Sequence, residues 1–99
     1  MNPIIKIYYR RNLNMTAAKL AAVCTHIGKE LALQNPMYFE GNDFMKDKVI
    51  VLEASDKKFN EYVNDFLAYD IPHHIHVDSG LKEVEKGTAC AVGFVYYDE

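Results

Sequence analysis

The sequence predicts an α/β fold in which helices cover both faces of a four-stranded mixed sheet. Short runs rich in β-branched and aromatic residues alternate with two segments of helical periodicity. The predicted strands are 4–9, 49–54, 73–77 and 89–97, and the predicted helices are 15–33 and 56–69. The order is therefore β-α-β-α-β-β, which is typical of a three-layer α/β/α architecture. We expect residues 1–99 to form a single domain.

The first half of the chain supplies a strand and the longer helix. The run IIKIYY at 4–9 is typical of a strand. In 15–33, Thr16 or Asn14 can cap the helix, and Pro36 ends it. The apolar face predicted for this helix comprises Leu20, Cys24, Ile27 and Leu31, and the adjoining face comprises Lys19, Val23, His26 and Glu30. Lys19 is thereby placed in the first turns of the helix, close to the strand that precedes it.

The second half contains the other elements. Residues 35–47 carry Pro, Gly, Asn and Asp and are expected to form a loop, with room for a short helix. The nearly continuous apolar run VIVLEA at 49–54 predicts a strand that is covered on both faces. Ser55 is the expected cap of the second helix, and Pro72 ends it. Its buried stripe is predicted to be Phe59, Tyr62 or Val63, and Phe66.

Composition restricts the class of function. With a hydrophobic content of 49% and a charged content of 25%, the chain matches an ordinary soluble protein. The net charge of −3 argues against broad, charge-driven contact with a nucleic-acid backbone, but it permits one local basic pocket for a phosphorylated ligand. No apolar run is long enough for a membrane helix. The two cysteines predict reduced thiols in a cytoplasmic protein rather than a disulfide framework.

Two separated segments carry a resemblance to a known family. They are MTAAKLAAVCTH, from Met15 to His26, and IPHHIHVDSGLKEVEKGTACAVGF, from Ile71 to Phe94. Together they resemble the peptidyl-tRNA hydrolases of the second, archaeal and eukaryotic type, over about residues 4–94. This resemblance implies the same fold, cleavage of the ester between a peptide and tRNA, no metal or organic cofactor, and a homodimer or homotetramer.

The resemblance also implies site residues. The family lysine of the first helix corresponds to Lys19, and the family aspartate corresponds to Asp78, so these two are the expected catalytic residues if the protein is active. A lysine can stabilise an oxyanion or hold a phosphate, and an aspartate can orient a base or a water molecule. The two family threonines are replaced by Lys82 and Cys90, and the family glutamine is replaced by Val23. Thr88 matches a further threonine of that segment.

These replacements favour capture of a ligand over catalysis. Two lysines around one aspartate suit an anion, and a cysteine is a weaker hydrogen-bond donor than a threonine. We therefore expect a non-catalytic protein that binds a small nucleotide or another phosphorylated ligand, and such a fold would suit a viral protein that sequesters a cyclic dinucleotide defence signal. The alternative is a peptidyl-tRNA hydrolase that acts on tRNA. The expected ligand-binding residues are Tyr9, Arg10, Arg11, Lys19, Asp78, Lys82 and Thr88.

The run HHIH raises the question of a metal site. On a strand, His74 and His76 share one face while His73 lies on the other. A zinc site requires a third or fourth ligand, and the spacing of His and Cys in the sequence does not supply one. We expect no metal site, and we expect His26 to be packed or hydrogen-bonded rather than catalytic.

Overall fold

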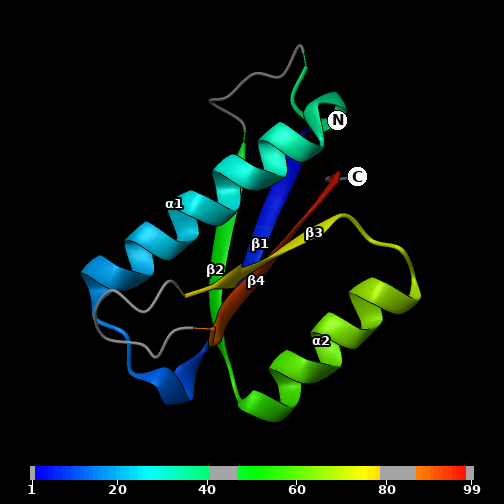
Figure 1. Ribbon diagram of the computed structural model, residues 1–99. Coiled ribbons are helices and arrows are strands. Elements are labelled where there is room, and N and C mark those ends of the chain that lie inside the picture. Colours follow the sequence, from blue (N-terminus) through cyan, green and yellow to red (C-terminus); the bar gives the residue numbers. More distant parts are fainter. Residues whose placement is uncertain (1, 41–46, 79–86, 98–99) are drawn as a thin grey trace.

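A computed structural model describes residues 2–40, 47–78 and 87–97 of the chain. Four strands form one mixed sheet in the order β2-β1-β4-β3 (Figure 1). The strands are β1 (Pro3–Arg10), β2 (Lys48–Ala54), β3 (His73–Val77) and β4 (Ala89–Tyr97). β2 runs parallel to β1, whereas β4 is antiparallel to both β1 and β3. The predicted mixed α/β sheet is confirmed.

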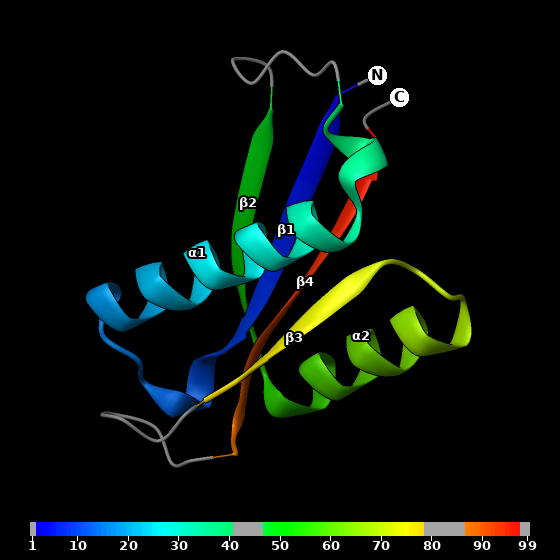
Figure 2. The same ribbon diagram turned by 45° about the horizontal axis from the view of Figure 1, so that its top comes forward.

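Two helices pack on opposite faces of the sheet. They are α1 (Ala17–Gln34) and α2 (Asp56–Ala68), and two short 3₁₀ segments, η1 (Arg11–Leu13) and η2 (Pro36–Tyr38), flank α1 (Figures 1 and 2). Both helices begin at the predicted caps, because the side chains of Thr16 and Ser55 accept hydrogen bonds from the backbone N–H groups of Lys19 and Lys58. In the part of the chain that the structure describes, no helix has both the length and the apolar character needed to span a membrane.

The larger core lies between α1 and the sheet. Val23, Ile27 and Leu31 of α1 are buried against Ile5 and Ile7 of β1 and against the middle of β4. Burial of such side chains contributes about 1.5–3 kcal/mol each, so this face supplies much of the stabilisation. The predicted helix face is rotated by about one position, because Val23 is buried while Leu20 and Cys24 are only partly buried.

The smaller core lies between α2 and the other face. Phe59 and Phe66 are its buried helical residues, as predicted, and they pack with Ala54 and Val92. Tyr62 stacks on Tyr8 of β1 with ring centroids 4.0 Å apart. The helix therefore holds the β1–β4 centre of the sheet from the side opposite α1.

The prediction that 49–54 is covered on both faces is wrong. β2 is an edge strand, and Val49, Val51 and Leu52 are 62%, 39% and 43% exposed. The physical reason is the placement of α1, which packs on β4 and β3 rather than on β2. An apolar hollow of about 460 Å³ remains beside β2, lined by Ile5, Ile7, Cys24, Thr25, Gly28, Lys29 and Val49.

Candidate functional site

The centre of the candidate site is an ion pair between α1 and the end of β3. Lys19 lies in the first turn of α1, and its Nζ contacts the Oδ1 atom of Asp78, the residue that follows β3. The Asp78 side chain is 0% exposed and that of Lys19 is 17% exposed. The family resemblance assigns these two residues to one site, and in the structure they are in contact.

Backbone hydrogen bonds fix the position of Asp78. Its N–H donates to the carbonyl of Thr88 at 2.9 Å, and its own carbonyl accepts from the N–H of Gly87 at 3.0 Å. Gly87 has a φ of +88°, a backbone conformation that residues other than glycine rarely adopt. The pairing of the two chain segments thus continues beyond β3, and it holds the carboxylate of Asp78 against α1.

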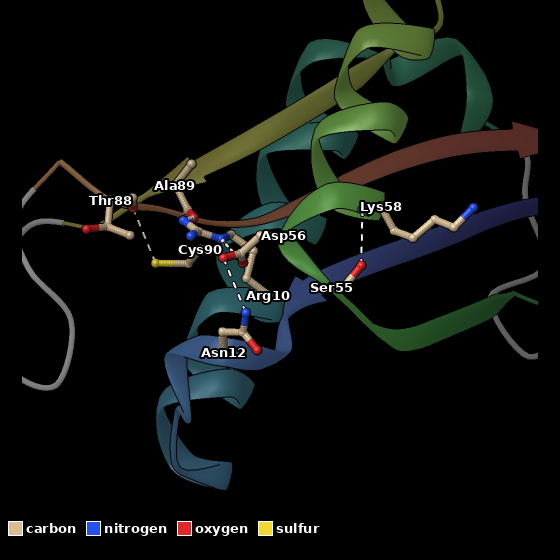
Figure 3. A network of polar contacts seen from close by, with 8 residues as sticks. All are labelled: Arg10, Asn12, Ser55, Asp56, Lys58, Thr88, Ala89 and Cys90. Carbon is tan, nitrogen blue, oxygen red and sulfur yellow. Dashed lines mark hydrogen bonds and ion pairs between the residues drawn. The ribbon is translucent and has the colours of Figure 1, made fainter.

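A break in the strand register places Cys90 beside this pair. The pairing of β3 with β4 shifts between His76 and Val77, where a bulge redirects side chains. Cys90 is fully buried in the α1-side core, and its Sγ donates to the carbonyl of Thr88 at 3.4 Å (Figure 3). Burial, followed by the charge of Asp78, raises the pKa of the Cys90 thiol. The thiol therefore stays protonated near neutral pH.

Arg10 is tied into the framework beside the site. Its Nε donates to Oδ1 of Asp56 at 3.0 Å, and its NH1 donates to the carbonyl of Ala89 at 2.9 Å (Figure 3). Asn12 donates to the second oxygen of Asp56 at 3.3 Å. The hydrogen bonds that Asp56 accepts from Arg10 and Asn12 lower the pKa of its carboxyl group. Arg10 thereby joins the end of β1 to the starts of α2 and β4.

The other expected ligand-binding residues are distributed unevenly. Arg11 pairs with Glu53 at 3.6 Å in an exposed position, and Tyr9 packs against the α1-side core. The backbone carbonyl of Thr88 accepts the hydrogen bond from the N–H of Asp78. Lys82 lies outside the described residues. Three basic residues that were expected to bind an anion lie within the described residues. Each is paired with a carboxylate: Arg10, Arg11 and Lys19.

Three histidines meet along the same α1–β3 seam. The ring centroid of His26 lies 5.0 Å from that of His76 and 5.9 Å from that of His74. Across the described ranges, no group of three His, Cys, Asp or Glu side chains is arranged to hold a metal ion. Burial is the main cause that lowers the pKa of both His74 and His76, and the neighbouring histidines lower it further.

The proximity of His26 to the site was not anticipated from the sequence. Two spacings indicate it in retrospect. His26 follows Lys19 by two helical turns, and His76 precedes Asp78 by two strand positions, so each pair shares one face of its element. With Lys19 against Asp78, these spacings are consistent with the observed contact of His26 with His76. The apolar hollow beside β2 includes none of these residues and is a separate feature.

Comparison with known proteins identifies one family. The family model described as peptidyl-tRNA hydrolase PTH2 matches residues 5–99, which is almost the whole chain. No curated protein matches the chain closely enough to count as a relative.

Proposed function

The chain belongs to the PTH2 family of peptidyl-tRNA hydrolases, and from this premise we propose that it cleaves the ester bond between a peptide and tRNA at the Lys19–Asp78 site. The observation that carries the proposal is the ion pair itself. Two residues from distant parts of the sequence meet at the junction of α1 and β3, with the carboxylate fully buried. Such a paired lysine has a fixed position from which it can stabilise an oxyanion.

The chemistry proposed for the pair follows from its burial. The Asp78 carboxylate is not exposed, so its role is to hold and orient the Lys19 ammonium rather than to contact the substrate. The partly exposed ammonium can face the ester carbonyl, where negative charge develops as water attacks. An oriented cation in a partly dehydrated site stabilises that charge more strongly than it would in water.

The paired state of the cations also supports hydrolysis over capture. A site that captures a phosphate needs uncompensated positive charge, yet Arg10, Arg11 and Lys19 each lie against a carboxylate. Arg10 in particular has its guanidinium committed to Asp56 and to the backbone of Ala89. The positive charge of these residues is therefore partly compensated before any phosphate binds.

A second candidate function is binding without catalysis, and the burial of two replaced residues favours it. Val23 and Cys90 stand where the family resemblance implies a glutamine and a threonine, and both are buried in the core. Neither can replace the lost hydrogen bonds to a reacting substrate. On this hypothesis the protein binds a small nucleotide, for example a cyclic dinucleotide sequestered by a viral protein.

One experiment tests the two candidates together. The purified protein is incubated with N-acetylated aminoacyl-tRNA, and the release of the acylated amino acid is measured. Lys19→Met should abolish release, whereas Lys29→Met, which changes an exposed lysine of the same helix, should leave it unchanged. An inert protein whose unfolding temperature rises with a mono-, di- or cyclic nucleotide would contradict the hydrolase and support the binding protein.

A further inference from the structure

We infer that His76 is the proton-accepting group of this site, in the place of the threonine hydroxyls that the chain lacks. This inference rests on the ester hydrolysis proposed above. It assigns a role to the histidine cluster of α1 and β3, which the Lys19–Asp78 pair alone does not explain.

The position of His76 follows from two rows of side chains that face each other. His76 of β3 and Asp78, the residue that follows β3, both contact α1, where they meet His26 and Lys19, respectively. The rings of His76 and His26 are nearly perpendicular, with an angle of 73° between their planes. The imidazole of His76 makes an edge contact with His26, and the charges of Lys19 and Asp78 both act on it.

The protonation state of His76 suits a base. Burial lowers its pKa, and His26, Lys19 and His74 lower it further, while Asp78 acts in the opposite direction. These are the charged or titratable neighbours on α1 and on β3 itself. On the other side of β3, the residue of β4 that pairs with His76 is Ala91, which carries no charge. The imidazole is therefore neutral near pH 7 and has a nitrogen lone pair available.

The described neighbours of His76 are less suited to the same task. The carboxylate of Asp78 is fully buried and engaged by Lys19. The thiol of Cys90 is buried, has a raised pKa, and donates to the carbonyl of Thr88. His76 is partly exposed, so water can reach it, and like the pair it contacts α1.

The proposed step balances without a further reactant. The oxygen of a water molecule attacks the acyl carbon of the ester, and a proton of that water passes to the imidazole of His76. When the tetrahedral intermediate collapses, the bond between the acyl carbon and the ribose oxygen breaks, and His76 returns the proton to that oxygen. The products are the peptide acid and tRNA with a free hydroxyl, and His76 is again neutral.

The test compares two histidines on opposite faces of one strand. His76→Gln should lower kcat by about 10²-fold or more with little change in KM, because general base catalysis typically contributes 10²–10⁴-fold. It should also remove the inflection on the acid side of the pH–rate profile. His73→Gln is the matched control, since His73 contacts Phe66 on the α2 side, and it should keep both the rate and the inflection.

A third variant tests the contact between the rings. His26→Gln removes a neighbour that lowers the pKa of His76, so the inflection should move to higher pH while hydrolysis persists. Circular dichroism of each variant shows whether it is folded. Hydrolysis that is equally fast, with an unchanged inflection, in the folded His76→Gln protein would overturn this inference alone. A wild-type protein that is inert toward acylated tRNA would overturn both the proposed function and this role.

Discussion

Lys19 and Asp78, which are 59 positions apart in the sequence, form an ion pair that joins the first turn of α1 to the end of β3. A buried pair of this kind is an unreliable source of stability, because removing two charges from water costs several kcal/mol. Its stronger effect is conformational. Because the carboxylate is buried, moving the ammonium away from it would lose a charge-assisted contact, so the pair favours one relative position of the start of α1 and the end of β3.

This relationship predicts a thermodynamic cycle. Asp78→Leu should destabilise the protein by about 3–5 kcal/mol, because it leaves the partly buried Lys19 ammonium without this carboxylate. The double variant Lys19→Met/Asp78→Leu should recover most of the loss, since it removes both charges. Urea denaturation measures the free energies of unfolding. A double variant that is as unstable as Asp78→Leu would show that packing of the aspartate, rather than charge, is responsible.

A second prediction concerns the contact of α1 with β4 at Gly93. A Cβ atom at this position would collide with Cγ2 of Ile27 and lie 3.2 Å from Cγ1 of Ile7. Both atoms belong to buried side chains, so we expect Gly93→Ala to cost about 1–3 kcal/mol of stability. Thermal or urea denaturation measures this change.

The matched control for Gly93 is a glycine with free space around it. At Gly28, in the interior of α1, a Cβ atom would meet no atom within 4 Å. Gly28→Ala should therefore stabilise the protein by about 0.5–1 kcal/mol, because alanine is the better helix former. Equal effects of the two substitutions would contradict the close approach of α1 to β4.

The sequence predicts the helices and strands of this fold better than it predicts how they pack against one another. The caps Thr16 and Ser55, and the buried Phe59 and Phe66, follow from local patterns that act within a few residues. The exposure of β2 does not, because it depends on which strands α1 covers, and a continuous apolar run reads the same at an edge as at the centre of a sheet.

The candidate site shows the same division. Lys19 and Asp78 came from motif positions, but their contact depends on the packing of α1 on β3. The sequence predicts ligand binding for Arg10 but does not indicate its ion pair with Asp56, because that pair arises only when β1 and the start of α2 lie side by side (Figure 3). Charge partners across elements are a tertiary property, and one sequence does not record them.

A third prediction concerns the dependence of stability on pH. The pKa values of His74 and His76 lie below the usual 6.5 in the folded protein, mainly because of burial, and return to it on unfolding. Between the folded pKa values and 6.5, the unfolded chain binds more protons, so stability should fall as pH decreases below about 6.5. Urea midpoints measured on both sides of this pH test the prediction.

The variant His74→Asn separates this effect from general acid denaturation. It removes one of the two lowered pKa values and a repulsive neighbour of His76, so the fall in stability below pH 6.5 should become shallower. Asp56, whose pKa is lowered, titrates below its usual 3.8 and affects a separate range. A slope that is the same in wild type and variant would exclude the histidine cluster as the cause.

The last prediction restores a hydroxyl at the site. Cys90→Thr replaces a weak donor, whose thiol now contacts the carbonyl of Thr88, with the residue that the family resemblance implies there. A neutral hydrogen bond contributes about 1 kcal/mol, so a hydroxyl that reaches the reacting groups should raise kcat for ester hydrolysis by about 5-fold. Cys90→Ser adds a hydroxyl without the methyl group, and it should raise kcat by less because it leaves a gap in the core. Hydrolysis of acylated tRNA at saturating substrate measures both variants. If both variants are as slow as the wild type while remaining folded, a hydroxyl at position 90 does not take part in the reaction of this chain.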